Sequence, residues 1–93
     1  MNVLQRIQHA VRTEQYELSV HAFEEAEDDE FLIVDIEHAL LNGKIAKKYT
    51  HDPKGTRYTV RGPALDDRLM IVVCRFCERT GLLILTVFRD FED

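Results

Sequence analysis

His21 is the residue of this chain best suited to acid–base chemistry, because the residues around it predict a fixed position. Ser19 precedes a helical run that begins with Val20, His21 and Ala22. A serine at this point caps a helix by accepting one of its free backbone N–H groups. Imidazole exchanges protons near neutral pH, so His21 is a candidate general base or general acid. A structural role in the core is the alternative.

Arg57 and Arg61 form a second group that could do chemistry. They stand four positions apart in a strand-like segment and therefore share one face, whereas Tyr58 and Val60 point the other way, toward a core. Two guanidinium groups on one sheet face can bind phosphate oxygens bidentately. Lys47, on the adjoining predicted strand, could widen the patch. The patch is a candidate phosphate-binding surface; charges that protect an edge strand from aggregation are the alternative.

Cys74 and Cys77 have the spacing of a metal-binding pair, but the chain contains one such pair. A tetrahedral zinc site needs four ligands, and alternation along a strand sends these two side chains to opposite faces. His38 or His51 could complete a site only by a coincidence of folding. We expect two ordinary thiols, no metal and no cofactor. Phosphate-loop, dinucleotide-binding, nucleophile-elbow and zinc-protease motifs are also missing from the sequence.

The charges are divided unevenly along the chain, whose net charge is -5. Residues 1–42 hold two basic and ten acidic side chains, a net of -8; residues 43–93 hold ten basic and seven acidic, a net of +3. Nucleic-acid binders usually carry a basic footprint, which the average charge here hides. The second half could offer a cationic surface to a polyanion, although acidic side chains that simply solvate helix faces explain the partition equally well.

The length and composition predict one folded domain that spans residues 1–93. The chain is 45% hydrophobic and 31% charged, which places it far from disordered compositions. No apolar run approaches the roughly 18 residues that a membrane span needs, and the first residues lack the pattern of a secretory signal. We therefore expect a cytoplasmic protein with no membrane partner.

The pattern of apolar residues predicts an α+β fold. A first helix of about a dozen residues starts near Val3, residues 16–18 are an extended link, and a second helix follows Ser19 and breaks near Phe31. A third helix ends at Gly43, which should adopt the left-handed conformation. Four strands are expected at residues 45–50, 56–61, 69–76 and 82–89, giving N-terminal helices packed on a four-stranded antiparallel meander sheet.

The two C-terminal strands differ from ordinary half-exposed strands. Residues 69–73 and 82–85 are apolar at successive positions, whereas a strand with one face in water alternates apolar and polar residues. We expect these strands to be central and buried on both sides. The helices can cover one face; the first helix, a second copy of the chain or another protein must cover the other.

Several short motifs, in this order and spacing, resemble the small bacterial domain of unknown function 4258 over residues 16–90. They are Ser19-x-His21-Ala22, Asp35-Ile36-x-x-Ala39-Leu40-x-x-Gly43, Arg61-Gly62, residues 69–73 and Thr86-Val87-Phe88. The resemblance implies the antiparallel-sheet fold of RelE-like and barnase-like ribonucleases. It also implies a toxin of a toxin–antitoxin pair, with an antitoxin protein as partner.

The chemistry that this resemblance implies is metal-independent RNA cleavage, in which the 2′-OH attacks the adjacent phosphate. His21 would be the general base or acid, Arg61 would stabilise the charge on the phosphoryl oxygens with help from Arg57 or Arg75, and Thr86 would orient the phosphate. Lys47, Arg57 and Arg75 would bind the RNA, including mRNA on the ribosome. DNA lacks the 2′-OH and should not be cut.

A non-catalytic interaction module is the alternative function. It would use the apolar sheet face to bind a partner or a second copy of the chain, with His21 fixed in the core. Two departures from the family pattern favour it. The chain has Glu24, Glu25 and Asp28 where the family tends to have Arg, and Phe88 where the last strand usually carries Tyr.

Overall fold

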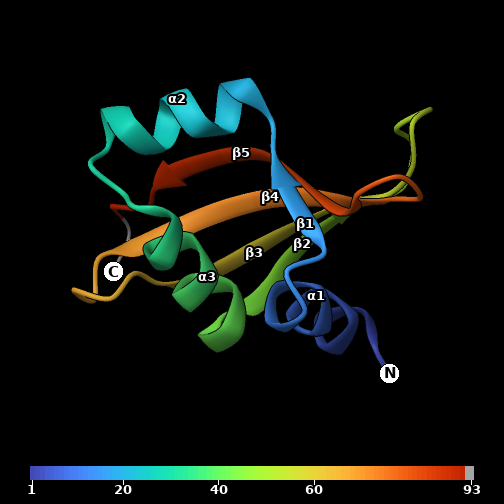
Figure 1. The fold of residues 1–93 in the computed structure, drawn as a ribbon, viewed down its shortest axis with the longest axis horizontal. Helices are drawn as coiled ribbons and strands as arrows, with labels where there is room; N and C mark the ends of the chain where they lie inside the picture. Colours follow the sequence, from blue (N-terminus) through green and yellow to red (C-terminus); the bar gives the residue numbers. More distant parts are fainter. Residues whose placement is uncertain (92–93) are drawn as a thin grey trace.

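The computed structural model describes residues 1–91, which form three helices and one five-stranded sheet (Figure 1). The predicted α+β class is confirmed, and within these residues no helix is long and apolar enough to cross a membrane. The helices are α1 (Val3–Arg12), α2 (Val20–Asp28) and α3 (Ile33–Asn42); the strands are β1 (Tyr16–Leu18), β2 (Lys44–Tyr49), β3 (Arg57–Pro63), β4 (Leu69–Cys77) and β5 (Gly81–Arg89).

Polar side chains fix the ends of the helices. At the start of α1, the Asn2 side chain accepts the Gln5 backbone N–H at 2.8 Å and the Gln5 side chain accepts the Asn2 N–H at 3.0 Å, which is a capping box. Ser19 caps α2 as predicted, because its Oγ accepts the Ala22 N–H at 3.0 Å. Gln8 of α1 donates to the Leu40 carbonyl at the end of α3, at 3.3 Å. These bonds set where each helix begins and how α1 meets α3.

The sheet has the strand order β1-β5-β4-β3-β2. The antiparallel meander of β2, β3, β4 and β5 agrees with the prediction, but the predicted total of four antiparallel strands is wrong. The link at residues 16–18 is a fifth strand, β1, which pairs parallel with β5 and aligns Tyr16 with Leu82 and Leu18 with Ile84. Three residues are too few to show an alternating pattern, so the expected extended link could not be recognised as a strand from the sequence.

Gly43 ends α3 as predicted, but not in the left-handed conformation. Its φ of -98° is open to any residue. A Cβ at this position would lie 2.5 Å from the Ala39 carbonyl oxygen and 2.6 Å from that of Arg61. Glycine is therefore needed because the backbone of β3 passes against the end of α3.

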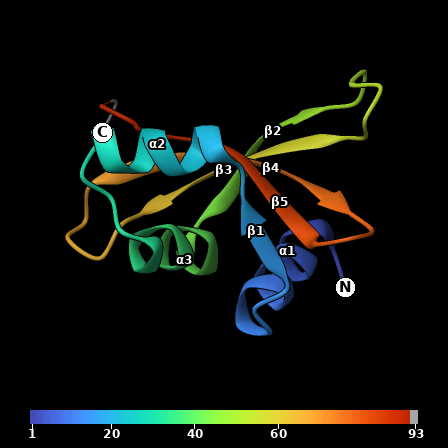
Figure 2. The same ribbon diagram turned by 45° about the horizontal axis from the view of Figure 1, so that its top comes forward.

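The helices lie together on one side of the sheet (Figures 1 and 2). Between the two layers, Ile36 and Leu40 of α3 are fully buried, as are Val60, Val72 and Ile84 of the central strands. The opposite face of the sheet, called here the outer face, is not covered by any helix of residues 1–91. Its apolar residues on β4 are only partly buried, and Phe88 is 42% exposed. The prediction that the central strands are buried on both sides is therefore wrong for the single chain.

Candidate nucleic-acid interface

The outer face carries two rows of side chains that run across the strands. Directly paired residues of neighbouring strands point to the same face, so the pairing register places these side chains together. One row crosses four strands and the other crosses three. The first is Lys47, Thr59, Val73 and Thr86, and the second is Arg61, Ile71 and Phe88.

These rows line an open groove of about 600 Å³. Four of the six residues predicted for RNA contact or catalysis lie along it: Lys47, Arg57, Arg61 and Thr86. The other lining residues are Ala46, Tyr49, Thr59, Ile71, Val73, Phe88 and Asp90. The predicted sharing of one face by Arg57 and Arg61 is confirmed, and Tyr58 and Val60 are buried on the helix side as expected.

Arg61 is oriented by Asp90, which follows the end of β5. The Arg61 Nε donates to the Asp90 Oδ2 at 2.6 Å, and the two side chains are 41% and 14% exposed. The Arg61 guanidinium is thus held on the outer face rather than swinging freely in water. The groove lining carries three cationic side chains and one carboxylate, so its charge favours an anion.

Arg57 lies where the groove meets the β2–β3 hairpin. Its Nε is 3.0 Å from Asp52 Oδ2, close enough for an ion pair, but the N–H is not aligned for a hydrogen bond. Its guanidinium also lies 5.4 Å from the centre of the Tyr49 ring. Tyr49 and Arg57 help to line a second open hollow of about 620 Å³ with residues 48 and 50–53. The concave surface therefore continues from the sheet onto the hairpin.

Arg75 lies outside this groove lining. Its Nη1 donates to the Lys54 carbonyl at 3.4 Å, which joins β4 to the tip of the β2–β3 hairpin. Arg75 pairs with Leu83 across the β4–β5 ladder. The described contacts give it a role in supporting the hairpin.

His21 also lies outside the groove lining. It is 69% exposed on the first turn of α2, so it is not a core residue, and its Nε2 is 3.2 Å from Glu25 Oε1. The same carboxylate oxygen of Glu25 accepts the Val87 N–H at 3.2 Å, and Asp29 accepts the Arg89 N–H at 2.9 Å. Side chains of α2 thus accept backbone N–H groups of β5 beyond the segment that pairs with β1. His21 sits beside this protected edge.

The two cysteines lie in different surroundings. Cys74 is fully buried and Cys77 is partly exposed at the end of β4. Among residues 1–91 no cluster of His, Cys, Asp and Glu could hold a metal ion. Burial raises the pKa of the Cys74 thiol to about 12. The backbone N–H groups of Arg79 and Thr80 lower the pKa of Cys77, the Arg79 group having the larger effect.

Asp90 and Tyr49 are among the groove residues that were not predicted from the sequence. Asp90 belongs to an acidic C-terminal stretch that reads as solvated surface, and nothing in the chain order indicates that it meets Arg61. Tyr49 ends an exposed basic strand, where the alternation that marks it as an outer-face residue is interrupted by a bulge between Ile45 and Lys47. An aromatic residue directly after two lysines was the available signal.

The fold and groove together define the class of this protein: a small α+β domain whose helices cover one face of a mixed sheet and leave a cationic groove on the other. The chain belongs to the family described as Domain of unknown function (DUF4258), whose model matches residues 18–89. A search of curated proteins and a search of solved structures each gave no match.

Proposed function

We propose that this protein binds single-stranded RNA along the outer face of its sheet and acts as a metal-independent endoribonuclease of the toxin type. The observation that supports the proposal best is the groove itself, where Lys47, Arg57 and Arg61 lie on one face with exposed aromatic rings. The proposal implies that the fold is RelE-like. The partners of the protein would be RNA, including mRNA on the ribosome, and an antitoxin protein.

The composition of the groove suits single-stranded RNA. Lysine and arginine bind the phosphates, and aromatic side chains stack on bases that are not paired. Tyr49 and Phe88 are each 42% exposed, so their rings are accessible to bases. They lie on β2 and β5, at the two ends of the groove, and a strand laid across the sheet would meet both. The 2′-OH distinguishes RNA from DNA in the cleavage step rather than in these contacts.

Cleavage would proceed by attack of the 2′-oxygen on the adjacent phosphorus. The 2′-oxygen loses its proton and bonds to phosphorus, the bond to the 5′-oxygen breaks, and that oxygen gains a proton. The products are a 2′,3′-cyclic phosphate and a 5′-OH. Arg61 would stabilise the charge that develops on the phosphoryl oxygens, and Thr86, one row away across β4, would donate a hydrogen bond to the phosphate.

Two groups are candidates for accepting the 2′-OH proton. Asp90 lines the groove beside Arg61, whereas His21, the residue predicted for this role, lies on α2 beside Glu25. A general base must come within hydrogen-bond reach of the proton that it removes, although apo geometry by itself does not exclude a candidate. Comparing His21→Ala with Asp90→Asn in a cleavage assay separates the two.

The test uses the purified chain with a short fluorescent RNA, in the presence of a metal chelator. We expect binding by fluorescence anisotropy, cleavage to a 2′,3′-cyclic phosphate, and no cleavage of the matching DNA. Arg61→Ala should reduce cleavage by about 10²–10³-fold, whereas Arg12→Ala, which removes the same charge from the end of α1, should not. Absence of binding at low salt would end the RNA proposal. Binding without cleavage, with and without ribosomes, would end the ribonuclease part.

The outer face also supports a second candidate function, self-association. Ile71 and Val73 lie side by side on β4 in the groove lining, and Phe88 is exposed next to Ile71. Such a surface can pair with a second copy of itself. Sedimentation of the wild type and Phe88→Ser distinguishes this candidate: a dimer that dissociates in the variant supports it, and a monomer at all concentrations removes it.

A further inference from the structure

The helical side of the molecule carries a second surface that the RNA proposal does not use. Several large apolar side chains of α2 and α3 are exposed to solvent. Phe23 and Ile33 are 48% and 47% exposed, and Leu32, which precedes α3, is 67% exposed. Apolar residues scattered singly on a surface need no explanation, but a contiguous patch marks a binding site. The question is whether these side chains are contiguous.

Two adjoining hollows show that they are. One, of about 330 Å³, lies between α2 and the start of α3 and is lined by Leu18, Phe23, Ala26, Glu27, Phe31, Leu32 and Ile33. The other, of about 320 Å³, is lined by Glu14, Tyr16, Glu17, Leu18, Phe23 and Ile33. Leu18, Phe23 and Ile33 line both hollows. The two therefore form one trough, called here the α2–α3 trough, which runs over β1 between the helices.

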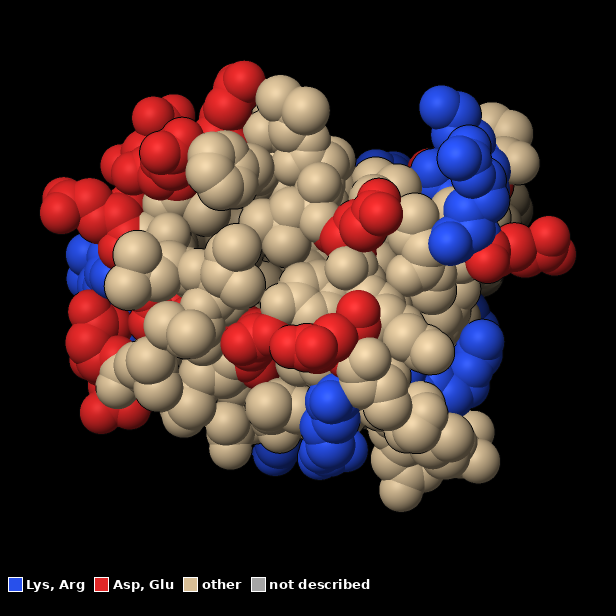
Figure 3. Space-filling view, in the orientation of Figure 1, with Lys and Arg blue, Asp and Glu red and all other residues tan. Residues whose placement is uncertain are grey.

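The charge around this trough is acidic. Glu14, Glu17 and Glu27 lie in its lining, and no lysine or arginine appears among the residues that line either hollow. Figure 3 shows the same face of the molecule: uncharged side chains fill the surface between α2 and α3, acidic ones lie over α2, along the left border and across the middle, and the basic ones gather mainly over the β2–β3 hairpin and the lower edge. A segment that fits this surface must be apolar on one side and basic on its flanks.

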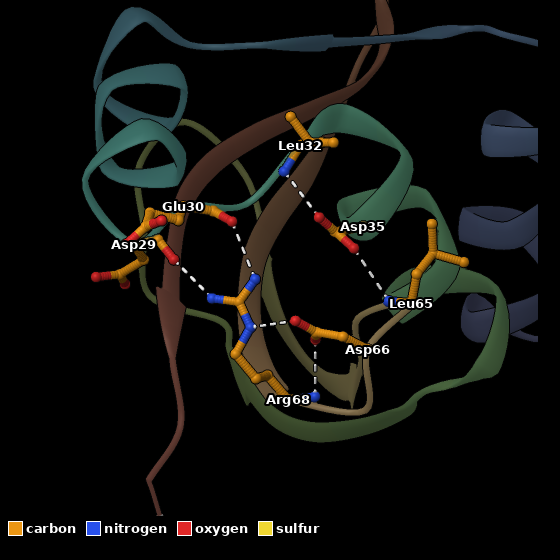
Figure 4. A network of polar contacts seen from close by, with 7 residues as sticks. All are labelled: Asp29, Glu30, Leu32, Asp35, Leu65, Asp66 and Arg68. Carbon is orange, nitrogen blue, oxygen red and sulfur yellow. Dashed lines mark hydrogen bonds and ion pairs between the residues drawn. The ribbon is translucent and has the colours of Figure 1, made fainter.

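The link between α2 and α3, which forms one wall of the trough, is held in place by the β3–β4 loop (Figure 4). Arg68 donates to the carbonyls of Asp29 and Glu30 at 2.8 and 2.9 Å, and its guanidinium lies 4.4 Å from the centre of the Phe31 ring. Asp35 accepts the Leu32 N–H at 2.8 Å and the Leu65 N–H at 3.0 Å. The wall is therefore fixed before any partner binds.

We propose that the α2–α3 trough is a docking site for a basic amphipathic helix of a protein partner. The apolar side of that helix would insert between Phe23 and Ile33, as in other complexes in which a helix lies in a groove. Its flanking lysine or arginine side chains would face Glu14, Glu17 and Glu27. The charge of the rim selects this occupant over an acidic one, because like charges across an interface oppose binding. The RNA groove lies on the other face of the sheet, so this proposal stands independently of the RNA proposal.

The test uses the full chain and three synthetic helical peptides, with binding measured by isothermal titration calorimetry. The first peptide has leucines along one face and lysines on both flanks, the second has glutamates in place of the lysines, and the third has serines in place of the leucines. We expect the first to bind, and the other two to bind about tenfold more weakly or not at all.

Variants of the protein test whether the first peptide binds in the trough. Phe23→Ser should abolish binding of the first peptide, whereas Val34→Ser, which removes an exposed apolar side chain from α3 that lines neither hollow, should not. Glu27→Lys should weaken the lysine peptide and strengthen the glutamate peptide. Phe23 and Glu27 are both exposed, so the fold should tolerate these changes.

Four results would overturn the proposal. The first is equal affinity for the lysine and glutamate peptides, and the second is binding that Phe23→Ser does not change. The third is self-association of the chain, seen by sedimentation and removed by Phe23→Ser, because a second copy would then be the occupant. Absence of binding by all three peptides also removes it.

Discussion

The Nε of Arg61 donates to the Oδ2 of Asp90 at 2.6 Å, across the strand β4 that separates the two residues. This bond joins a central strand to the residue that follows the last strand. It sets the direction of the guanidinium on the outer face. It also places a negative charge beside the cation that we propose to bind phosphate, so the two residues should have opposite effects on RNA affinity.

Removal of each charge in turn tests this relationship. Arg61→Ala should weaken RNA binding and lower the slope of log K against log salt by about 0.7, the value for one lost contact with a single-strand phosphate. Asp90→Asn should strengthen binding by up to about fivefold, because it removes a repulsive charge at a partly exposed site. Anisotropy titrations at several salt concentrations measure both. A weaker complex in Asp90→Asn would mean that the orientation of Arg61 by the carboxylate matters more for RNA binding than its repulsion of the phosphate does.

The close packing of α3 on β3 depends on a second glycine, Gly62. A Cβ at this position would overlap the backbone carbonyl oxygen of Ala39. Gly62→Ala should therefore lower the free energy of unfolding by about 1–3 kcal/mol, the usual range for overpacking, as measured by urea denaturation. The second variant, Gly62→Ala with Ala39→Gly, should be no more stable, because the obstructing atom belongs to the backbone. Wild-type stability in Gly62→Ala would show that α3 can move away from β3.

Much of the fold follows from local patterns in the sequence. The cap at Ser19, the break near Phe31 and the four meander strands are set by side chains close to one another in the chain, and the structure has all of them. Strand β1 is different, because a three-residue segment becomes a strand only through its pairing with β5, over sixty residues away. Gly43 is a similar case: its place at the end of α3 was predictable, but the approach of β3 that requires glycine is a tertiary contact.

The candidate site was predictable to the extent that it depends on strand alternation. That rule places Arg57 and Arg61 on one face, and the meander brings Lys47 and Thr86 beside them. It says nothing of residues outside the strands, so Asp90 was missed. It also cannot relate a helix to a sheet face, and His21 is found beside the edge of β5 instead of in the groove. The apolar pattern of β4 and β5 correctly indicated a central position in the sheet. The pattern alone cannot tell whether a second layer of the same chain covers the outer face.

Arg68 is expected to stabilise the fold more than a surface arginine does. It bonds to two carbonyls at the end of α2, stacks on Phe31 and pairs with Asp66 at 2.8 Å. Arg68→Ala should lower the free energy of unfolding by about 1–3 kcal/mol. Arg68→Lys should recover little of this, because one ammonium group cannot reproduce the planar fork of donors.

The control for Arg68 is Arg79→Ala, in the exposed turn between β4 and β5, which should change stability by about 0.5 kcal/mol or less. Urea unfolding of the three variants gives the comparison. Equal losses of unfolding free energy in Arg68→Ala and Arg79→Ala would mean that the hydrogen bonds of Arg68 add nothing to stability beyond the effect of its charge.

The two cysteines should differ in reactivity, because the thiolate is the form that reacts. Burial raises the pKa of Cys74 from 9.0 to about 12, whereas hydrogen bonds from the backbone N–H groups of Arg79 and Thr80 lower the pKa of the partly exposed Cys77. Iodoacetamide at mildly alkaline pH should therefore modify Cys77 in the folded protein and leave Cys74 unmodified, as measured by peptide mass spectrometry. Both should react in urea.

The same shift gives a pH dependence of stability with a definite sign. Cys74 binds its proton more tightly when folded, so its contribution is complete below pH 9.0 and is lost as the pH rises toward about 12. Cys74→Ala removes this titrating group, and its unfolding free energy should fall less steeply over that window than that of the wild type. Cys77→Ala is the matched control and should keep the wild-type decline. Identical pH profiles for wild type and Cys74→Ala would show that the buried thiol is not the group responsible.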